Sequence, residues 1–133
     1  MTLWHQAAEL GNAKSYYSIG IAYKHGDGVG RDEKKGNHYY ELSAMGGVVE
    51  ARYNLGVAEY IAGNMDRAVK HHMIAAGSGF TPSLENIKQM FKNGQATKDD
   101  YAKALLAYQA NLVEIKSPQR DEAAAISNNY KYY

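Results

Sequence analysis

The sequence contains no cysteine and only two prolines among its 133 residues. The absence of cysteine excludes disulfide bonds, thiolate metal sites and a cysteine nucleophile. Basic residues outnumber acidic residues by only 15 to 14, a formal net charge of +1. This balance disfavours a dedicated nucleic-acid or membrane-surface protein, because such proteins usually carry a strong basic excess. No apolar run approaches the roughly 18 residues of a membrane span, and the length suits one domain with a sizeable core.

An internal repeat is what the sequence does contain. A shift of 36 residues superimposes identical residues at Ala8/Ala44, Gly11/Gly47, Tyr17/Tyr53, Gly20/Gly56 and Ala22/Ala58. A further shift of 32 residues superimposes Ala44/Ala76, Gly47/Gly79 and Asn54/Asn86. The difference between the two shifts falls in a loop, because Gly26–Arg31 of the first unit is shortened to Ala62–Gly63 in the second. Length variation confined to a loop is typical of a repeat built from two helices.

Each unit predicts a hairpin of two α-helices. Small or apolar residues share one face of each first helix, namely Ser15, Ile19, Ala22 and Gly26, then Ala51, Leu55, Ala58 and Ala62. The second helices carry Gly36, Tyr40, Ser43 and Ala44, then Ala68, His72, Ala75 and Ala76. Asp32 and Asn64 are expected to cap the second helices, and Gly47 and Gly79 to end them. A single hairpin cannot bury both faces, so neighbouring hairpins should stack. A closed helical bundle with accidental internal similarity is the alternative.

The first unit reads Ala8, Gly11, Ser15, Ile19-Gly20, Tyr23, Gly26-Asp27-Gly28-Val29, Asp32, Gly36, Tyr40 and Ser43-Ala44. In this order the residues resemble the Sel-one-like repeat family, a relative of the tetratricopeptide repeats, and the resemblance covers residues 4–94. It implies an all-α fold, a right-handed α-α superhelix in which a tetratricopeptide-like solenoid of helical hairpins ends in a C-terminal capping helix. Such proteins generally act as scaffolds or adaptors without a catalytic centre.

Three features depart from the family pattern. Gly36 stands where the family prefers alanine, at an expected cost of up to ~1 kcal/mol in a helix. Lys88 replaces the tight glycine of Gly20 and Gly56, so residues 80–94 are expected to form a degenerate, terminating half-unit. Residues 4–8 resemble the end of a second helix, which favours the C-terminal part of a longer array or a truncated member.

The predicted domain organisation is helical repeats over residues 1–94, capping helices over 95–128 and a disordered tail over 129–133. Thr97 and Asp100 suggest a capping box. An apolar stripe then follows on a helix of about 98–116, made of Tyr101, Leu105, Tyr108, Leu112 and Ile115. Ser117-Pro118 is expected to start a further helix. The stripe caps the stack or forms a docking surface for another chain, and both interpretations stay open.

The sequence predicts no enzyme activity, no catalytic residues, no metal and no cofactor. The glycine-rich segment Gly26–Gly30 lacks a preceding strand and the GxxxxGK[ST] pattern of a phosphate-binding loop. His71 and His72 diverge by about 100° on a helix, so they are not expected to chelate one ion. His72 matches the inward aromatic position of Tyr40, and packing is its expected role. Ser78 has no strand before it, so a nucleophile elbow is not supported.

Two functions remain. The first is a protein–protein interaction scaffold that binds a protein or peptide on the concave face of the stack, which by analogy is lined by the first helix of each hairpin. The candidate partner-binding residues are Lys14, Tyr17, Lys24, Glu50, Tyr53, Tyr60, Gln89 and Lys92. Tyr17 and Tyr53 could instead pack between units, and Asn54 and Asn86 could bind a peptide or tie hairpins together.

The alternative is single-stranded RNA binding, with tyrosines stacked on bases. Glu50 and the near-neutral charge oppose it, so no nucleic acid and no membrane are expected as partners. The absence of cysteine and of a visible signal peptide favours an intracellular, cytoplasmic location.

Overall fold

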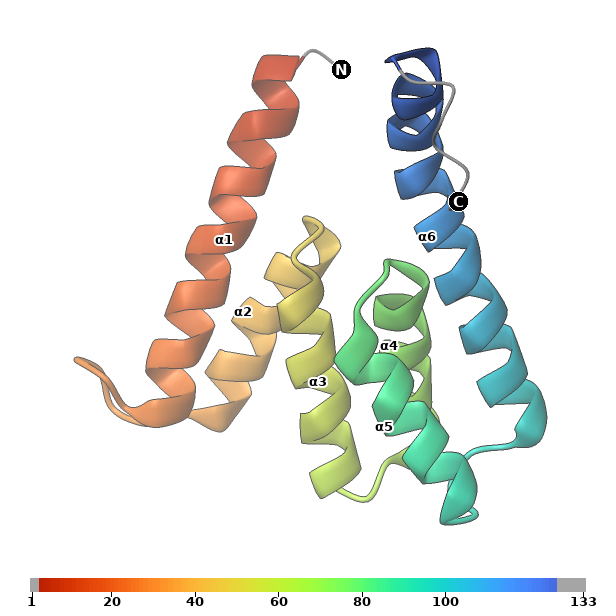
Figure 1. Cartoon of the computed structure of the whole chain (residues 1–133). Coiled ribbons are helices and arrows are strands. Elements are labelled where there is room, and N and C mark those ends of the chain that lie inside the picture. Colours follow the sequence, from red (N-terminus) through yellow and green to blue (C-terminus); the bar gives the residue numbers. More distant parts are fainter. Residues whose placement is uncertain (1–2, 127–133) are drawn as a thin grey trace.

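The computed structural model describes the backbone of residues 3–126 and the side chains of residues 10–113. This part of the chain contains six α-helices and no strand, which confirms the predicted all-α class. The helices are α1 (Leu3–His25), α2 (Glu33–Met45), α3 (Val49–Ile61), α4 (Met65–Gly77), α5 (Thr81–Lys92) and α6 (Lys98–Ile126). The two long helices, α1 and α6, flank the four shorter ones (Figure 1).

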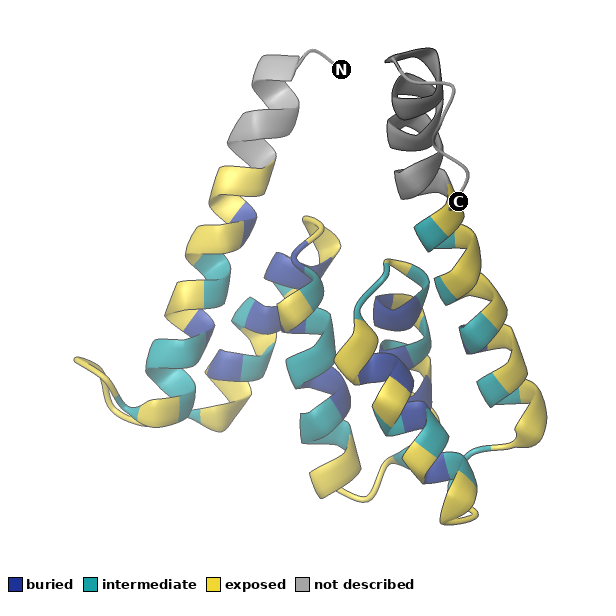
Figure 2. Cartoon of the chain, viewed as in Figure 1, coloured by how far each residue is buried: buried dark blue, intermediate teal, exposed yellow. Residues whose placement is uncertain are grey.

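Each helix packs against the next one in the sequence, as successive helical hairpins do. α1 contacts α2, α2 contacts α3, and α3 contacts α4; α4 then contacts both α5 and α6, and α5 contacts α6. The buried residues follow these contacts between the helices (Figure 2). One core cluster joins the first three helices through Ala13, Tyr40, Ala44, Val48, Ala51 and Leu55. A second joins the last three through Ala76, Leu84, Ile87 and Ala104.

The ends of four helices share one geometry. At the end of α2, the N–H of Val48 donates to the carbonyl of Ser43 at 3.1 Å, and the N–H of Gly47 donates to the carbonyl of Ala44 at 3.0 Å. This pair of bonds is a Schellman motif, and it requires a residue with positive φ. Gly47 has a φ of 100°. The predicted terminating role of Gly47 is therefore confirmed, and Gly63, Gly79 and Gly94 have the same role.

Of the three predicted caps at Asp32, Asn64 and Thr97, two are confirmed. The N–H of Lys35 donates to Asp32 Oδ1 at 3.1 Å, which caps α2. The capping box before α6 is complete, because the N–H of Asp100 donates to Thr97 Oγ1 at 3.0 Å and the N–H of Thr97 donates to Asp100 Oδ2 at 3.1 Å. Asn64 occupies the cap position of α4 but its side chain does not cap the helix. Its amide donates instead to Glu59 Oε2 at 2.9 Å, which competes with capping.

Glycines allow the helices of the first two hairpins to approach closely. A Cβ on Gly20 would lie 2.7 Å from the ring of Tyr40, and a Cβ on Gly56 would lie 2.7 Å from Nε2 of His72. A Cβ on Gly36 would lie 2.6 Å from Cγ of Lys24 and 3.1 Å from the carbonyl oxygen of Gly20. Gly36 is therefore not simply a weak helix residue, since the alanine that the family pattern prefers would require the Lys24 side chain to shift. His72 is buried, which confirms its expected packing role.

The expectations for the beginning of the chain are wrong in two respects. α1 runs without a break from Leu3 to His25, so residues 4–8 are not the end of a separate helix. A glycine costs a helix only about 1 kcal/mol, and no neighbouring helix forces a turn at Gly11, where a Cβ would meet nothing within 4 Å. The predicted inward face is also wrong, because Ser15 and Ile19 are exposed while Ala13 and Gly20 are buried. α3 buries Ala51 and Leu55 because α2 precedes it, whereas α1 packs chiefly against α2 alone.

For the last helix, the predicted apolar inner face is confirmed, but the predicted end of the helix is not. Tyr101, Leu105 and Tyr108 pack on the second core cluster, and Leu112 is half-buried. The predicted break at Ser117-Pro118 is wrong, since α6 continues to Ile126. Proline inside a helix loses one backbone hydrogen bond and crowds the carbonyl four residues earlier, but its φ is one that helices also use, and α6 runs through Pro118. The side chain of Ile115 and the tail predicted to be disordered lie outside the described residues.

Candidate peptide-binding groove

Two pockets adjoin on the surface of α3, and both are lined by Val57. The first, here called the charged pocket, has a volume of about 450 Å³ and lies between α3 and the α1–α2 turn. It is lined by Lys24, His25, Arg31, Glu33, Tyr40, Asn54, Val57, Ala58 and Ile61. The second, here called the amide pocket, has a volume of about 200 Å³ and lies between α3, α4 and α5. It is lined by Val57, Tyr60, His72, Asn86, Gln89, Met90, Asn93 and Gln95. The two pockets have Val57 of α3 as a common lining residue and are here together called the groove.

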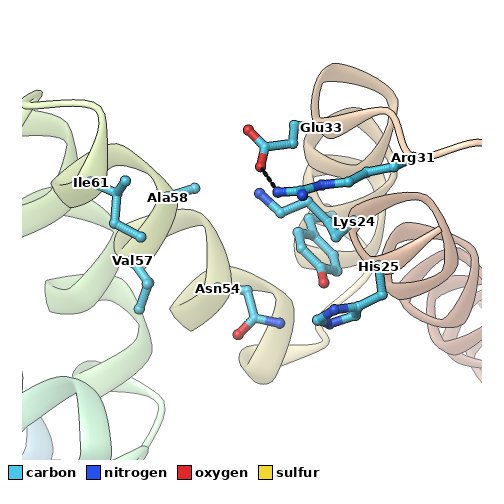
Figure 3. A pocket seen from close by; sticks show the side chains of 9 residues that line it. Lys24, His25, Arg31, Glu33, Asn54, Val57, Ala58 and Ile61 are labelled. Carbon is cyan, nitrogen blue, oxygen red and sulfur yellow. Dashed lines mark hydrogen bonds and ion pairs between the residues drawn. The ribbon is translucent and has the colours of Figure 1, made fainter.

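The charged pocket has two chemically different walls (Figure 3). One wall carries Lys24, Arg31 and Glu33 at the α1–α2 turn. The other wall is apolar and comes from α3, where Ile61 is 79% exposed. The turn folds back on α1 because the N–H of Asp32 donates to the carbonyl of Tyr23 at 2.9 Å. This bond places Arg31 beside the end of α1, where Lys24 lies.

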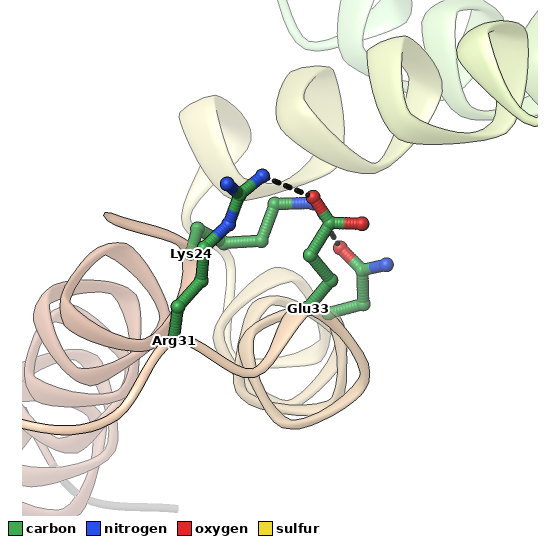
Figure 4. Close-up of polar contacts among 4 residues, drawn as sticks. Lys24, Arg31 and Glu33 are labelled. Carbon is green, nitrogen blue, oxygen red and sulfur yellow. Dashed lines mark hydrogen bonds and ion pairs between the residues drawn. The ribbon is translucent and has the colours of Figure 1, made fainter. Parts of the chain in front are cut away.

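The charged wall contains one ion pair and one hydrogen bond to a neutral group (Figure 4). Nη2 of Arg31 lies 2.8 Å from Oε1 of Glu33, with both side chains more than half exposed. Nζ of Lys24 donates to Oδ1 of Asn37 at 3.0 Å. The hydrogen bond from Arg31 and the charges of Lys24 and Arg31 lower the pKa of Glu33, so its carboxyl group is ionised. Because the pair is exposed, it contributes little to stability and can exchange partners.

The amide pocket is lined by uncharged groups that donate and accept hydrogen bonds. The hydroxyl of Tyr60 donates to Oε1 of Gln95 at 3.2 Å, and Nε2 of Gln89 donates to Oδ1 of Asn93 at 3.2 Å. His72 is 1% exposed and hydrogen-bonds through Nδ1 with the hydroxyl of Ser83 at 3.1 Å. Burial, and then the neighbouring His71, lower the pKa of His72 to about 4. His72 is therefore neutral at pH 7, and the pocket carries no charge.

The structure brings only some of the predicted binding residues together. Lys24 lines the charged pocket, and Tyr60 and Gln89 line the amide pocket. Lys14, Glu50 and Lys92 are exposed but line neither pocket.

The two remaining candidates, Tyr17 and Tyr53, take part in helix packing. The rings of Tyr17 and Tyr40 have centroids 5.8 Å apart, and the amide of Asn54 donates to the Tyr17 hydroxyl at 3.4 Å. Tyr53 meets His72 and Phe80 edge-on, each with ring centroids 5.4 Å apart. The interpretation that these tyrosines pack between units therefore describes the structure better than a ligand-contacting role.

Sequence reasoning did not find Arg31, Glu33 and Ile61, or Asn93 and Gln95 after α5. Arg31 and Glu33 belong to the segment that follows the glycine-rich turn, whose length in the first unit was visible as an insertion. That insertion was the available signal, because an extended turn at the end of a first helix can reach the face of the next one.

Searches of the described residues find no group of three or more His, Cys, Asp or Glu side chains that could hold a metal ion. They also find no helix that is long and apolar enough to cross a membrane.

Comparison with known proteins finds no match: no family model, no curated protein and no solved structure is detectably similar to this chain. The class of protein is therefore defined by the fold alone, as an all-helical domain of six helices packed in sequential pairs.

Proposed function

We propose that this protein is a non-catalytic interaction module that binds a peptide segment of another protein in the groove formed by the charged and amide pockets. The observation that carries this proposal is that Val57 of α3 lines both pockets, so that they lie on either side of one residue. The groove offers an apolar wall, charged groups and a row of amides, which is the mixture that peptide recognition uses.

The internal repeat supports the proposed Sel-one-like, right-handed superhelical arrangement. Gly20 lies against Tyr40, and Gly56 lies against His72. Gly20 and Gly56 are 36 residues apart in the sequence, and Tyr40 and His72 are 32 residues apart. These are the two shifts of the internal repeat. Equivalent contacts in two successive hairpins favour stacked repeats over an irregular bundle, and stacked hairpins offer extended binding surfaces.

Single-stranded RNA binding receives no support from a specific observation. Tyr17 and Tyr53, two of the candidate binding residues, already pack against other aromatic rings. Glu33 also adds a negative charge within the groove. The proposed partner is a polypeptide, and the intracellular location expected from the sequence stays a prediction.

The test is selection of a random peptide library displayed on phage against the immobilised protein. The variant Val57→Asp places a charge where the two pockets meet, and Met45→Asp is the matched control, because Met45 is 80% exposed and lies outside both pockets. We expect enriched peptides to lose at least tenfold in affinity for Val57→Asp and to bind Met45→Asp as they bind the wild type. Circular dichroism verifies that both variants fold.

Two outcomes would overturn the proposal. One is the failure of any peptide to be enriched over the bare support. The other is equal affinity of the enriched peptides for folded Val57→Asp and for the wild type.

A further inference from the structure

We infer that the charged pocket receives the carboxylate of an aspartate or glutamate side chain of the bound peptide, while a large apolar residue next to it packs on the α3 wall. This inference rests on the proposed peptide-binding function and adds the chemistry of the peptide that the groove selects.

The charges that line the pocket do not balance. Two permanent cations, Lys24 and Arg31, line it together with one carboxylate, Glu33. The hydrogen bond of Lys24 is to the neutral amide of Asn37, so it does not compensate the ammonium charge. One positive charge is left over. The pocket therefore has a place for one further negative charge.

The groups already in the pocket bear on the kind of anion. Arg31 already holds a carboxylate at 2.8 Å, that of Glu33, which shows that the guanidinium lies within reach of carboxylate oxygens in this pocket. A guanidinium presents several N–H donors and can serve a second carboxylate beside the first. A phosphate dianion would bring twice the charge beside the ionised Glu33. The pocket consequently favours a carboxylate over a phosphate group.

The opposite wall of the pocket is apolar. Val57, Ala58 and Ile61 form it, and the side chain of Ile61 is 79% exposed although it is apolar. Successive side chains of an extended peptide point to opposite sides. An acidic residue directed at Arg31 and Lys24 therefore directs its neighbour in the sequence at this wall. Covering Ile61 with an apolar side chain removes apolar surface from water, which adds to the affinity.

Glu33 has a further consequence in this arrangement, because it competes with the ligand. Its carboxylate already accepts a hydrogen bond from Nη2 of Arg31, and its negative charge repels an incoming carboxylate. Removing the charge of Glu33 should therefore increase the affinity for an acidic peptide. A merely structural role for the ion pair would not produce that gain.

The experiment uses NMR titration of the ¹⁵N-labelled full chain with two capped peptides, Ser-Gly-Glu-Leu-Gly-Ser and its counterpart with glutamine in place of glutamate. We expect the acidic peptide to shift the resonances of Arg31, Val57 and Ile61 and to bind about fivefold more tightly than the neutral one. The preference should shrink as salt is added, because the charges are exposed.

Three variants sharpen the assignment. Arg31→Gln should abolish the preference for the acidic peptide, and Glu33→Gln should raise the affinity for it about three- to tenfold. Arg67→Gln is the matched control, because Arg67 is equally exposed, lies outside the groove and also faces a carboxylate, Glu59 Oε2 at 3.9 Å. This control should bind both peptides as the wild type does.

The outcomes separate this inference from the proposed function. Equal binding of both peptides in the groove overturns the inference and leaves the proposed function standing. Weaker binding of the acidic peptide by Glu33→Gln overturns the inference too. So does binding more than about tenfold tighter when phosphoserine replaces the glutamate, which would assign the pocket to a phosphate group. If neither peptide shifts a groove resonance, the inference fails, and the phage selection decides the proposed function independently.

Discussion

Two glycines of α1 have opposite surroundings although both are helical. A Cβ on Gly20 would lie 2.7 Å from the Tyr40 ring and 3.1 Å from the carbonyl oxygen of Gly36. A Cβ on Gly11 would meet nothing within 4 Å. Tyr40 is buried and packs on Tyr17, so its ring cannot move aside easily.

The first prediction compares alanine at these two positions. Gly20→Ala should lower the free energy of unfolding by about 1–3 kcal/mol, because the added methyl group overpacks the helix crossing. Gly11→Ala should raise it by up to about 1 kcal/mol, because alanine favours the helix and no clash results. Urea denaturation of both variants measures the difference. A loss of stability in Gly11→Ala equal to that in Gly20→Ala would contradict the close crossing.

The second prediction is that the protein loses stability in acid because His72 is buried. Burial lowers its pKa to about 4 from the ordinary 6.5, so the folded protein keeps the ring neutral where the unfolded chain takes up a proton. Stability is therefore complete above pH 6.5 and is lost as the pH falls towards 4. Between pH 7 and pH 4.5 the loss from this residue should be about 2.5 kcal/mol.

The control for this prediction is the double variant His72→Phe/Ser83→Ala, which removes the histidine and its hydrogen-bond partner together. Its unfolding free energy should fall less between the two pH values than that of the wild type. His71, whose pKa burial also lowers, remains in both proteins and cancels in the comparison. An identical fall in both proteins would refute the buried, neutral state of His72.

At the scale of the helices, α6 packs on both α4 and α5. Its inner face buries Ala104 (1% exposed) against the second core cluster, whereas Leu106 on its outer face is 67% exposed. Positions 104 and 106 of this helix are therefore buried and exposed, respectively, although they are only two residues apart.

The third prediction uses this contrast. Ala104→Glu should lower the free energy of unfolding by about 3 kcal/mol or more, because a carboxylate would be buried without a partner. Leu106→Glu should change it by no more than about 0.5 kcal/mol. Thermal unfolding followed by circular dichroism compares the two. Similar melting temperatures for both variants would show that α6 does not pack on this face.

Sequence patterns predicted the local features of the helices but not which faces find a neighbour. The capping box at Thr97 and the terminating role of Gly47 depend on a few adjacent residues, so they could be read directly. The face of Ser15 and Ile19 has the same periodicity as Ala51 and Leu55, yet only the second is covered, because only α3 follows another hairpin. Periodicity shows what a helix could bury, and the neighbouring elements decide whether it does.

At the scale of the whole molecule, the central hairpin is held from both sides. α3 packs on α2 and α4, and α4 packs on α3, α5 and α6, whereas α1 packs chiefly on α2. Stability in a stack of hairpins is shared between neighbours, so the elements with neighbours on both sides should open least often.

The fourth prediction follows from this arrangement. Amide hydrogen exchange should be slowest in α3 and α4 and faster in α1. Within residues 10–25 of α1, exchange should be fastest at residues 10–12, which precede the buried Ala13. Mass spectrometry of peptic fragments measures the gradient. Uniform protection along the described helices would indicate a single cooperative unit instead.

The groove is a property of the whole molecule, and for that reason only part of it was predicted. Lys24, Tyr60 and Gln89 were predicted by analogy with tetratricopeptide-like stacks, in which the first helices line the binding face. Arg31 and Glu33 join the groove only because the turn after α1 folds back towards α3. That path depends on tertiary contacts such as the bond between Asp32 and Tyr23, which no local pattern encodes.

The contact between Lys24 and Gly36 connects helix packing to the lining of the charged pocket. The aliphatic part of Lys24 lies over Gly36, where the absence of a methyl group gives it room. A larger residue at position 36 would require the stem of Lys24, a residue of the charged pocket, to shift. Under the proposed function, a substitution at a position that lines neither pocket would thus alter which peptides are preferred, so selectivity could evolve from within the scaffold.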